Sequence, residues 1–185
     1  MDMACFIDAA ENLADIRPAA AGTPDFSELY ETHYAAVYRA ALRVTGNPAD
    51  AEDALQTVFL RISGTLAQGG ELPAARNPEA WFKRAACNAA IDILRRRTAR
   101  AEVSIHDVSD VPLKPVVEPE MFLKERLRRA IAALEPEDAE LFLLRYVEGL
   151  SNGELAELFR QEKNNIAVRL HRIRQTLQME LISGQ

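Results

Sequence analysis

The chain has 185 residues and a formal net charge of -6; 48% of its residues are hydrophobic and 27% are charged. This composition is typical of an ordinary globular protein with one medium domain or two small ones. No apolar run approaches the roughly 20 residues that a membrane-spanning helix requires. Acidic residues crowd the start, where a signal peptide would be basic. We therefore expect a cytoplasmic protein without membrane insertion.

Cysteine and histidine residues are too scattered to indicate a chemical site. Cys5 and Cys87 lie far apart, and His33, His106 and His171 do not have the spacing of metal ligands. The sequence also lacks a glycine-rich phosphate loop and the short motifs of common hydrolases and metalloenzymes. It therefore predicts no catalytic residue, no cofactor and no metal, and an enzyme is the weakest functional class.

Basic residues are concentrated in two parts of this acidic chain. One is residues 83–100, which include Arg95, Arg96 and Arg97, and the other is residues 160–174. A cation near a helix C-terminus contributes roughly 0.3 to 1 kcal/mol when exposed. This effect explains one or two of the arginines that follow residue 94, and the rest need another explanation.

Helical periodicity begins at Phe26, after which apolar residues recur every three or four positions. Gly46 ends this predicted helix. Asn47 and Pro48 then provide a cap and a first helical residue for a second helix. Residues 63–77 contain three glycines and a proline, so we interpret them as a loop.

Asn77 and Pro78 repeat the cap and proline and open a third helix, which runs into the arginines. Residues 101–120 lose the helical period, are acidic and contain three prolines, as expected of a flexible linker. The fold class is therefore all-α, with two small helical domains. In chain order, the N-terminal extension, first domain, linker and second domain are residues 1–25, 26–100, 101–120 and 121–185. The extension is either a short helix or a frayed terminus.

The second domain contains a helix-turn-helix pattern. Ser151 and Glu154 form a capping box for a short helix, and a polar turn at residues 160–163 leads into a longer amphipathic helix. This arrangement places a helix in the DNA major groove, where arginine and asparagine side chains read base edges. A solvated helix face is the alternative interpretation of the same basic surface.

Two further patterns have both a structural and a functional interpretation. The carboxylates of Asp50, Glu52 and Asp53 suit the N-terminal end of a helix, as a solvated cap or as a docking surface. Trp81 beside Lys83 is either a core residue or a platform on which an unpaired base stacks.

Taken in this order, the segments resemble extracytoplasmic-function bacterial sigma factors of the sigma-70 family. The resemblance covers residues 26–100 and 121–182 and rests on DAEDALQTVF, NPEAWFKRAACNAAIDILRRR and LLRYVEGLS. It implies a region-two domain that docks on the clamp helices of core RNA polymerase and opens the promoter minus-ten element. It implies a region-four domain that binds the polymerase flap and reads the minus-thirty-five element. The loop at 63–77 would capture a flipped base, and an anti-sigma factor is a further candidate partner.

The resemblance also implies roles for individual residues. Those on the polymerase-docking helix are Asp50, Glu52, Asp53, Leu55, Gln56 and Phe59. Those at minus-ten DNA are Trp81, Lys83, Arg84, Asn88, Asp92, Arg95, Arg96 and Arg97. Those at minus-thirty-five DNA are Lys163, Asn164, Asn165, Ala167, Val168, Arg169, His171 and Arg172.

Two positions depart from the family pattern. Arg160 stands where the turn usually has a glycine, and Ala167 replaces a common basic residue. A non-glycine residue at positive φ costs roughly 1 kcal/mol or more, so we expect a turn of different shape. Promoter-specific transcription initiation is the main hypothesis. The alternatives are a stand-alone helix-turn-helix regulator and a sigma-like decoy that binds a regulatory protein.

Overall fold

The computed structural model describes residues 25–69, 77–107 and 119–183, and every regular element in them is a helix. The helices are α2 (Phe26–Thr45), α3 (Pro48–Ala67), α4 (Pro78–Asp107), α5 (Pro119–Ala133), α6 (Pro136–Tyr146), α7 (Asn152–Phe159) and α8 (Lys163–Ser183). The all-α prediction is confirmed. The predicted extension through residue 24, loop residues 70–76 and linker residues 108–118 lie outside the described residues. No helix in the described ranges is long and apolar enough to cross a membrane.

The junction between α2 and α3 follows its sequence signals. Gly46 ends α2 in the left-handed conformation, at φ 66°. The Asn47 side chain then accepts a hydrogen bond of 2.8 Å from the backbone N–H of Ala49. The guanidinium of Arg128, on α5, fills the space that a Cβ atom at Gly46 would need. The positive φ angle therefore favours glycine here, and a larger residue would also displace the Arg128 guanidinium.

Two predicted helix boundaries are wrong. Helix α3 continues to Ala67 instead of giving way to a loop, because Leu66 extends its apolar side and one interior glycine costs only about 1 kcal/mol. Helix α4 continues to Asp107, through the first part of the predicted linker, because the first proline comes only at Pro112.

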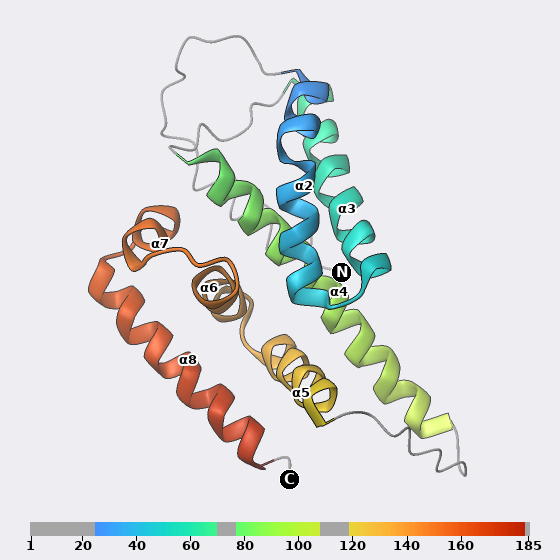
Figure 1. Ribbon diagram of the computed structural model, residues 1–185, viewed down its shortest axis with the longest axis vertical. Helices are drawn as coiled ribbons and strands as arrows, with labels where there is room; N and C mark the ends of the chain where they lie inside the picture. The colour runs from blue at the N-terminus through green and yellow to red at the C-terminus, as the bar shows by residue number, and fades with distance from the viewer. Residues whose placement is uncertain (1–24, 70–76, 108–118, 184–185) are drawn as a thin grey trace.

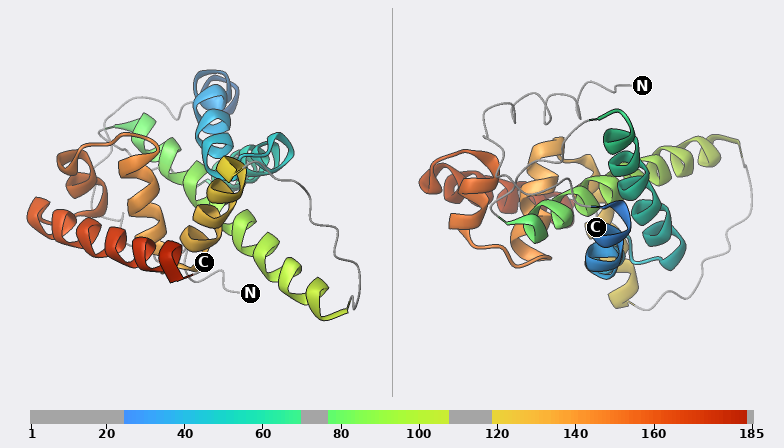
Figure 2. Two further views of the ribbon diagram at one scale, coloured as in Figure 1. Left: turned by 60° about the horizontal axis from the view of Figure 1, so that its bottom comes forward. Right: turned by 90° about the horizontal axis from the view of Figure 1, so that it is seen from above.

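The helices form two groups, and α4 lies between them (Figures 1 and 2). In the first group, α2, α3 and α4 pack on one another around a core that includes Phe59, Phe82 and Ile93. The second group consists of α5 to α8, and α5 and α6 contact the other side of α4. Helix α4 therefore has protein on two sides.

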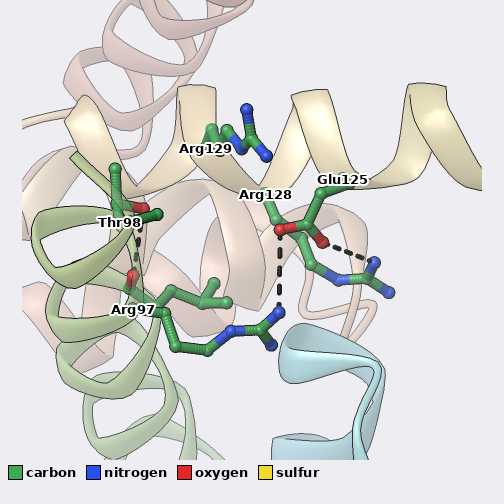
Figure 3. A pocket seen from close by; sticks show the side chains of 7 residues that line it. Arg97, Thr98, Glu125, Arg128 and Arg129 are labelled. Carbon is green, nitrogen blue, oxygen red and sulfur yellow. Dashed lines mark hydrogen bonds and ion pairs between the residues drawn. The ribbon is translucent and has the colours of Figure 1, made fainter. Parts of the chain in front are cut away.

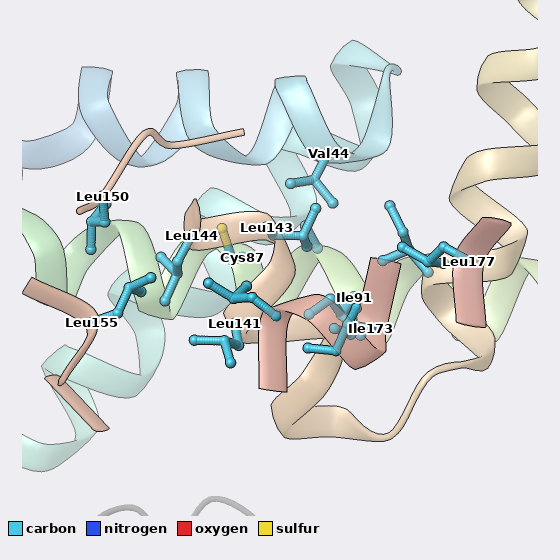
Figure 4. Packing of buried hydrophobic residues seen from close by; sticks show 14 of the residues in the cluster. Val44, Cys87, Ile91, Leu141, Leu143, Leu144, Leu150, Leu155, Ile173 and Leu177 are labelled. Atoms are coloured by element: carbon cyan, nitrogen blue, oxygen red, sulfur yellow. The ribbon is translucent and has the colours of Figure 1, made fainter. Parts of the chain in front are cut away.

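A second hydrophobic cluster joins the two groups. It contains Leu141 and Leu144 of α6 together with Cys87, Ile91 and Leu94 of α4, as Figure 4 shows for the labelled members. The sequence led us to expect two small domains joined by a linker, but in this structure they share this cluster. The reason is that α4 is apolar on two sides, and a helix of that kind is buried against two partners.

Candidate functional site

The solvent-facing side of α3 carries three of the predicted docking residues. Glu52, Asp53 and Gln56 are exposed. Leu60, one turn beyond Gln56, is 71% exposed and lies on the same side. Sequence reasoning missed Leu60, although its position outside the apolar stripe of α3 was a usable signal. This side of α3 therefore presents acidic and amide groups next to an exposed apolar side chain.

The other predicted docking residues lie in different surroundings. Leu55 is half-buried and packs against the core of the first group. Asp50 accepts a hydrogen bond of 2.8 Å from Arg97 of α4. Phe59 is only 4% exposed, and its ring lies edge-on to Tyr30 with the centroids 4.7 Å apart. The prediction that Phe59 offers a docking surface is corrected, because its ring is part of the core that holds α3 in place.

A buried acid from α6 lies against two of the predicted minus-ten residues. Glu140 is ion-paired with Arg84 and accepts a hydrogen bond of 3.2 Å from the amide of Asn88. Arg84 also donates to the carbonyl oxygen of Leu158 at 3.3 Å, and its guanidinium lies 4.7 Å from the ring centroid of Phe159. Both Arg84 and Asn88 therefore contact the second helical group.

The environment of Glu140 is nearly closed to solvent, since the residue is 4% exposed. Burial raises the pKa of the Glu140 carboxyl, although the charge of Arg84 and the hydrogen bonds from Arg84 and Asn88 act in the opposite direction. Sequence reasoning did not single out Glu140. The usable signal was a charged residue between Ala139 and Leu141, inside an apolar run that otherwise predicts burial.

Arginines from each group bind the C-terminal end of a helix in the other group. Arg95 of α4 donates to the carbonyl oxygens of Ala132 at 3.1 Å and Leu134 at 2.7 Å, at the end of α5. Arg128 of α5 donates to the carbonyl oxygen of Val44 at 3.1 Å, near the end of α2. The last carbonyls of a helix have no partner within it and carry partial negative charge, so these are favourable positions for a cation.

Arg97 lies beside α5 at a small cavity (Figure 3). Its guanidinium is 3.8 Å from Glu125, which is also 3.5 Å from Arg128. Together with its bond to Asp50, this gives Arg97 acidic neighbours from both groups. Arg97 nevertheless remains exposed to solvent.

The rest of the predicted minus-ten set is more accessible. Arg96 and Asp92 are exposed, and the Arg96 guanidinium donates to the backbone carbonyl of Asp92 at 3.3 Å. Lys83 is half-buried and pairs with an acid one turn earlier. Trp81 is half-buried, with its ring edge-on to Phe82 at 5.1 Å. Arg96 and Asp92 therefore lie on a solvent-exposed side of α4, where the Asp92 carboxylate is 3.9 Å from the guanidinium of Arg61 of α3.

The turn before α8 contains a residue that is in the left-handed conformation but is not a glycine. Arg160 takes φ 51° and ψ 43° and ends α7, and its N–H donates to the carbonyl oxygen of Glu157. The N–H of Gln161 donates to the carbonyl oxygen of Ala156 at 2.9 Å. These bonds are those of a helix end that uses a left-handed residue. The sequence led us to expect a turn of different shape, because Arg160 stands where the family usually has a glycine. In the structure, Arg160 itself adopts the left-handed conformation that glycine takes easily.

The solvent-facing side of α8 carries most of the predicted minus-thirty-five residues. The exposed ones are Lys163, Asn164, Asn165, Ala167, Val168, His171 and Arg172. The opposite side of α8 is buried. Arg169 is the exception, because it is half-buried and its guanidinium is ion-paired with Glu137 at 2.8 Å and with Asp138. Arg169 therefore holds α8 against α6.

Comparisons with known proteins agree with this arrangement. The family model "Sigma-70 region 2" matches residues 29–100, and "Sigma-70, region 4" matches residues 124–177. The extracytoplasmic-function (ECF) RNA polymerase sigma factor SigL of Mycobacterium tuberculosis is 30% identical over 165 residues, which cover 88% of this chain and 92% of that protein. The chain belongs to the sigma-70 family, as an ECF sigma factor.

Two other matches extend the comparison. The ECF sigma factor SigE of Mycolicibacterium smegmatis is 32% identical over 164 residues, and this match spans 85% of the chain but only 62% of that relative. The structure of CnrH in complex with the cytosolic domain of CnrY has a TM-score of 0.51 and 23% identity, over 97% of each chain. This likeness supports the fold.

Family membership connects the two helical groups with two functional regions. The region-2 match spans most of α2, all of α3 and the first three quarters of α4, and the region-4 match begins in α5 and ends in α8. Sigma factors bind core RNA polymerase and DNA and are transcription initiation factors rather than enzymes. The main hypothesis from the sequence is therefore confirmed at the level of the family. The roles of individual residues stay predictions.

Proposed function

We propose that this sigma factor docks on core RNA polymerase through α3 and directs it to promoters that α4 and α8 contact. Residues 26–100 would act as the region-two domain, 101–120 as the linker and 121–185 as the region-four domain. The observation that carries the proposal is that both family regions occur in one chain, and that α3 and α8, which lie in these regions, each have a solvent-exposed side with polar residues. Such a chain works in the cytoplasm, with the polymerase.

The docking step would use the exposed side of α3. Glu52, Asp53 and Gln56 supply polar contacts to the clamp helices, and Leu60 supplies apolar area. Protein interfaces combine an apolar centre with a polar rim, and this side of α3 has both kinds of group. An acidic surface also fits a factor that binds a basic partner before it reaches DNA.

The melting step would use α4. Opening a duplex breaks no covalent bond, but it loses base stacking of about 1.4 kcal/mol per step. Captured bases and neutralised phosphates must compensate for that loss. In the proposed roles Asn88 meets an extruded base, and Arg84 and Arg96 bind phosphates. Each neutralised phosphate would give a salt-dependence slope of about -0.9 on duplex DNA.

The reading step would use the exposed side of α8. Asn164, Asn165 and Arg172 carry amide and guanidinium groups that form paired hydrogen bonds with adenine or guanine edges. Lys163, at the start of the helix, would bind a backbone phosphate. Ala167 would offer a methyl group to a thymine rather than a charge.

In vitro transcription with purified core polymerase tests the proposal. Asp53→Arg should abolish core binding in a fluorescence anisotropy assay, because it reverses a charge in the docking surface. Glu180→Arg, at an exposed position near the end of α8, is the matched charge control and should bind normally. Arg96→Ala should bind core polymerase but fail to form open complexes, as detected by permanganate reactivity of unpaired thymines.

Two results would contradict the proposal. If the chain binds core polymerase but gives no run-off transcript from any genomic promoter fragment, it is a decoy. If it binds promoter duplex tightly and without salt dependence in the absence of polymerase, it is a stand-alone regulator, because phosphate-dominated binding weakens with salt.

A further inference from the structure

We propose that the small cavity between α4 and α5 binds a free phosphate-type anion, such as inorganic phosphate, pyrophosphate or the terminal phosphate of a small phosphorylated molecule. We call it the anion cavity. Its charged lining residues are Arg97 of α4 and Glu125, Arg128 and Arg129 of α5 (Figure 3). The inference goes beyond the proposed function, because the roles proposed for α3, α4 and α8 do not depend on it.

The wall of the anion cavity carries more positive than negative charge. Three guanidinium groups line it, and Glu125 is the one carboxylate among the described residues of the wall. Asp50, which is not part of the wall, accepts a hydrogen bond of 2.8 Å from Arg97. Even when both carboxylates are counted, the arginines leave one positive charge in excess. In a protein with a net charge of -6, this excess makes the cavity a local site of attraction for an anion.

The arginines of the cavity are only partly neutralised by their neighbours. Glu125 is 3.8 Å from Arg97 and 3.5 Å from Arg128, so a single carboxylate serves two guanidiniums at distances longer than those of good hydrogen bonds. Within the described parts of the chain, Arg129 has neither a hydrogen bond nor an ion pair. Each guanidinium has five N–H donors, so all three arginines keep donors for a ligand.

The size and chemistry of the cavity select a phosphate group. Its volume is about 140 Å³. Pockets that enclose drug-sized ligands have about 300 to 1,000 Å³, so this cavity holds one phosphate group and leaves the rest of a larger molecule outside. A phosphate group has three acceptor oxygens and a charge of about -1.5 to -2, which matches several arginines better than the two oxygens and single charge of a carboxylate. Guanidinium groups also bind phosphate through paired hydrogen bonds.

The position of the cavity favours a small free anion over the backbone of DNA. Helices α4 and α5 pack on each other beside it, and the side chain of Arg128 is only 21% exposed. A DNA backbone would have to enter between these two helices to reach all three arginines. Arg96, the next residue of α4, lies on the solvent-exposed side, where a backbone has access without such an entry. We therefore assign the cavity to a small anion and treat DNA as the competing outcome of the test.

Isothermal titration calorimetry of the full-length chain tests the site. Pyrophosphate and inorganic phosphate are the probes, in chloride buffers of constant ionic strength. We expect saturable binding of one pyrophosphate per chain. Arg129→Ala should weaken this binding about tenfold or more, because it removes charged hydrogen bonds to the anion. Circular dichroism should show an unchanged fold, since the substitution removes no hydrogen bond or ion pair among the described residues.

Two further variants separate a built site from general attraction of anions. Arg174→Ala, at an exposed position on α8, removes the same charge away from the cavity wall and is the matched control. It should bind pyrophosphate as the original chain does. Glu125→Gln keeps the shape of the wall but removes the carboxylate that competes with the ligand for Arg97 and Arg128. This variant should bind pyrophosphate more tightly than the original chain.

Three results would overturn the inference. The first is that neither probe binds with saturation. The second is that Arg129→Ala and Arg174→Ala weaken binding equally, or that Glu125→Gln fails to strengthen it. The third is that a short DNA duplex displaces pyrophosphate from the original chain and loses affinity with Arg129→Ala, because the cavity would then take a phosphate of DNA. We expect the duplex to leave the bound pyrophosphate in place.

Discussion

The two basic helices of this sigma factor differ in what surrounds them. On α4, Arg84 and Arg95 are half-buried and contact the second helical group. On α8, Asn164 and Arg172 face solvent, although both helices were predicted to bind DNA. The comparison indicates that the predicted minus-thirty-five residues of α8 are mostly exposed, while part of the predicted minus-ten set on α4 is covered by the second helical group.

The difference follows from how many apolar sides each helix has. Helix α8 has one buried side, which includes Ile166 and Ile173, so its other side stays in solvent. Helix α4 is apolar on two sides, so some of its cations lie close to other helices: Arg84 binds a buried acid, and Arg95 binds C-terminal carbonyls. The same residue type is thus exposed on one helix and a structural contact on the other, according to its neighbours.

The largest expected effect tests how far the two groups depend on each other. Phe59→Ala should lower the free energy of unfolding by about 3 to 5 kcal/mol, because it empties the core of α2 to α4. Urea unfolding followed by circular dichroism measures this change. Since the two groups share a cluster, we expect one transition shifted as a whole. A transition that splits, with the second group unchanged, would show that the groups are energetically independent.

Leu60→Ala is the matched control for Phe59→Ala. Leu60 is 71% exposed, so its removal should change the free energy of unfolding by no more than about 0.5 kcal/mol. Binding to core polymerase should nevertheless weaken, because Leu60 lies beside the proposed docking residues. Equal core binding by this variant and the original chain would remove Leu60 from the docking surface.

The next effect separates two neighbouring arginines of α4. Arg95→Ala should lower the free energy of unfolding by roughly 1.5 to 3 kcal/mol, because it removes charged hydrogen bonds to the end of α5. Arg96→Ala, at an exposed position, should change it by less than about 0.5 kcal/mol. Urea unfolding of both variants checks the difference. Similar small changes would mean that Arg95 is not a structural contact.

Much of the fold was predictable from the sequence, because the signals were local. Asn47 with Pro48 and Ser151 with Glu154 marked helix starts, and both caps form with the expected hydrogen bonds. The helix-turn-helix followed from the same kind of signal. The predicted end of α4 was wrong because we interpreted the acidic segment after residue 100 as a linker. Acidic composition alone does not end a helix, which needs a proline or another local signal to stop.

The contact between the groups was not predictable in the same way. Nothing local to Glu140 indicates that its partners are Arg84 and Asn88, more than fifty positions away. The apolar pattern of α4 did not indicate its second buried side. Alanines such as Ala90 occur both in cores and on surfaces, so they do not distinguish the two. Phe59 was assigned by its place in a motif, although its spacing along α3 already indicated burial.

A smaller effect concerns the turn that positions α8. Arg160→Gly should raise the free energy of unfolding by up to about 1 kcal/mol, because glycine takes a positive φ without the strain of a side chain, although it also adds entropy to the unfolded chain. The DNA affinity proposed for the exposed side of α8 should not change, which fluorescence anisotropy with a duplex would measure. A destabilised variant would show that contacts of the Arg160 side chain outweigh the strain.

The smallest expected effect is a pH dependence of the free energy of unfolding that comes from one histidine of the first helical group. The ring of His33 stacks on Phe82 with the centroids 3.9 Å apart, and desolvation lowers the pKa of His33 from 6.5 although Glu79 acts in the opposite direction. Between that lowered pKa and 6.5, the unfolded chain binds more protons than the folded chain, so stability falls as the pH is lowered through this window. The difference in unfolding free energy between the original chain and His33→Leu, measured in urea at several pH values, isolates this contribution from that of Glu140. The difference should shift in favour of leucine as the pH drops below 6.5, and a constant difference would mean that His33 is equally solvated in both states.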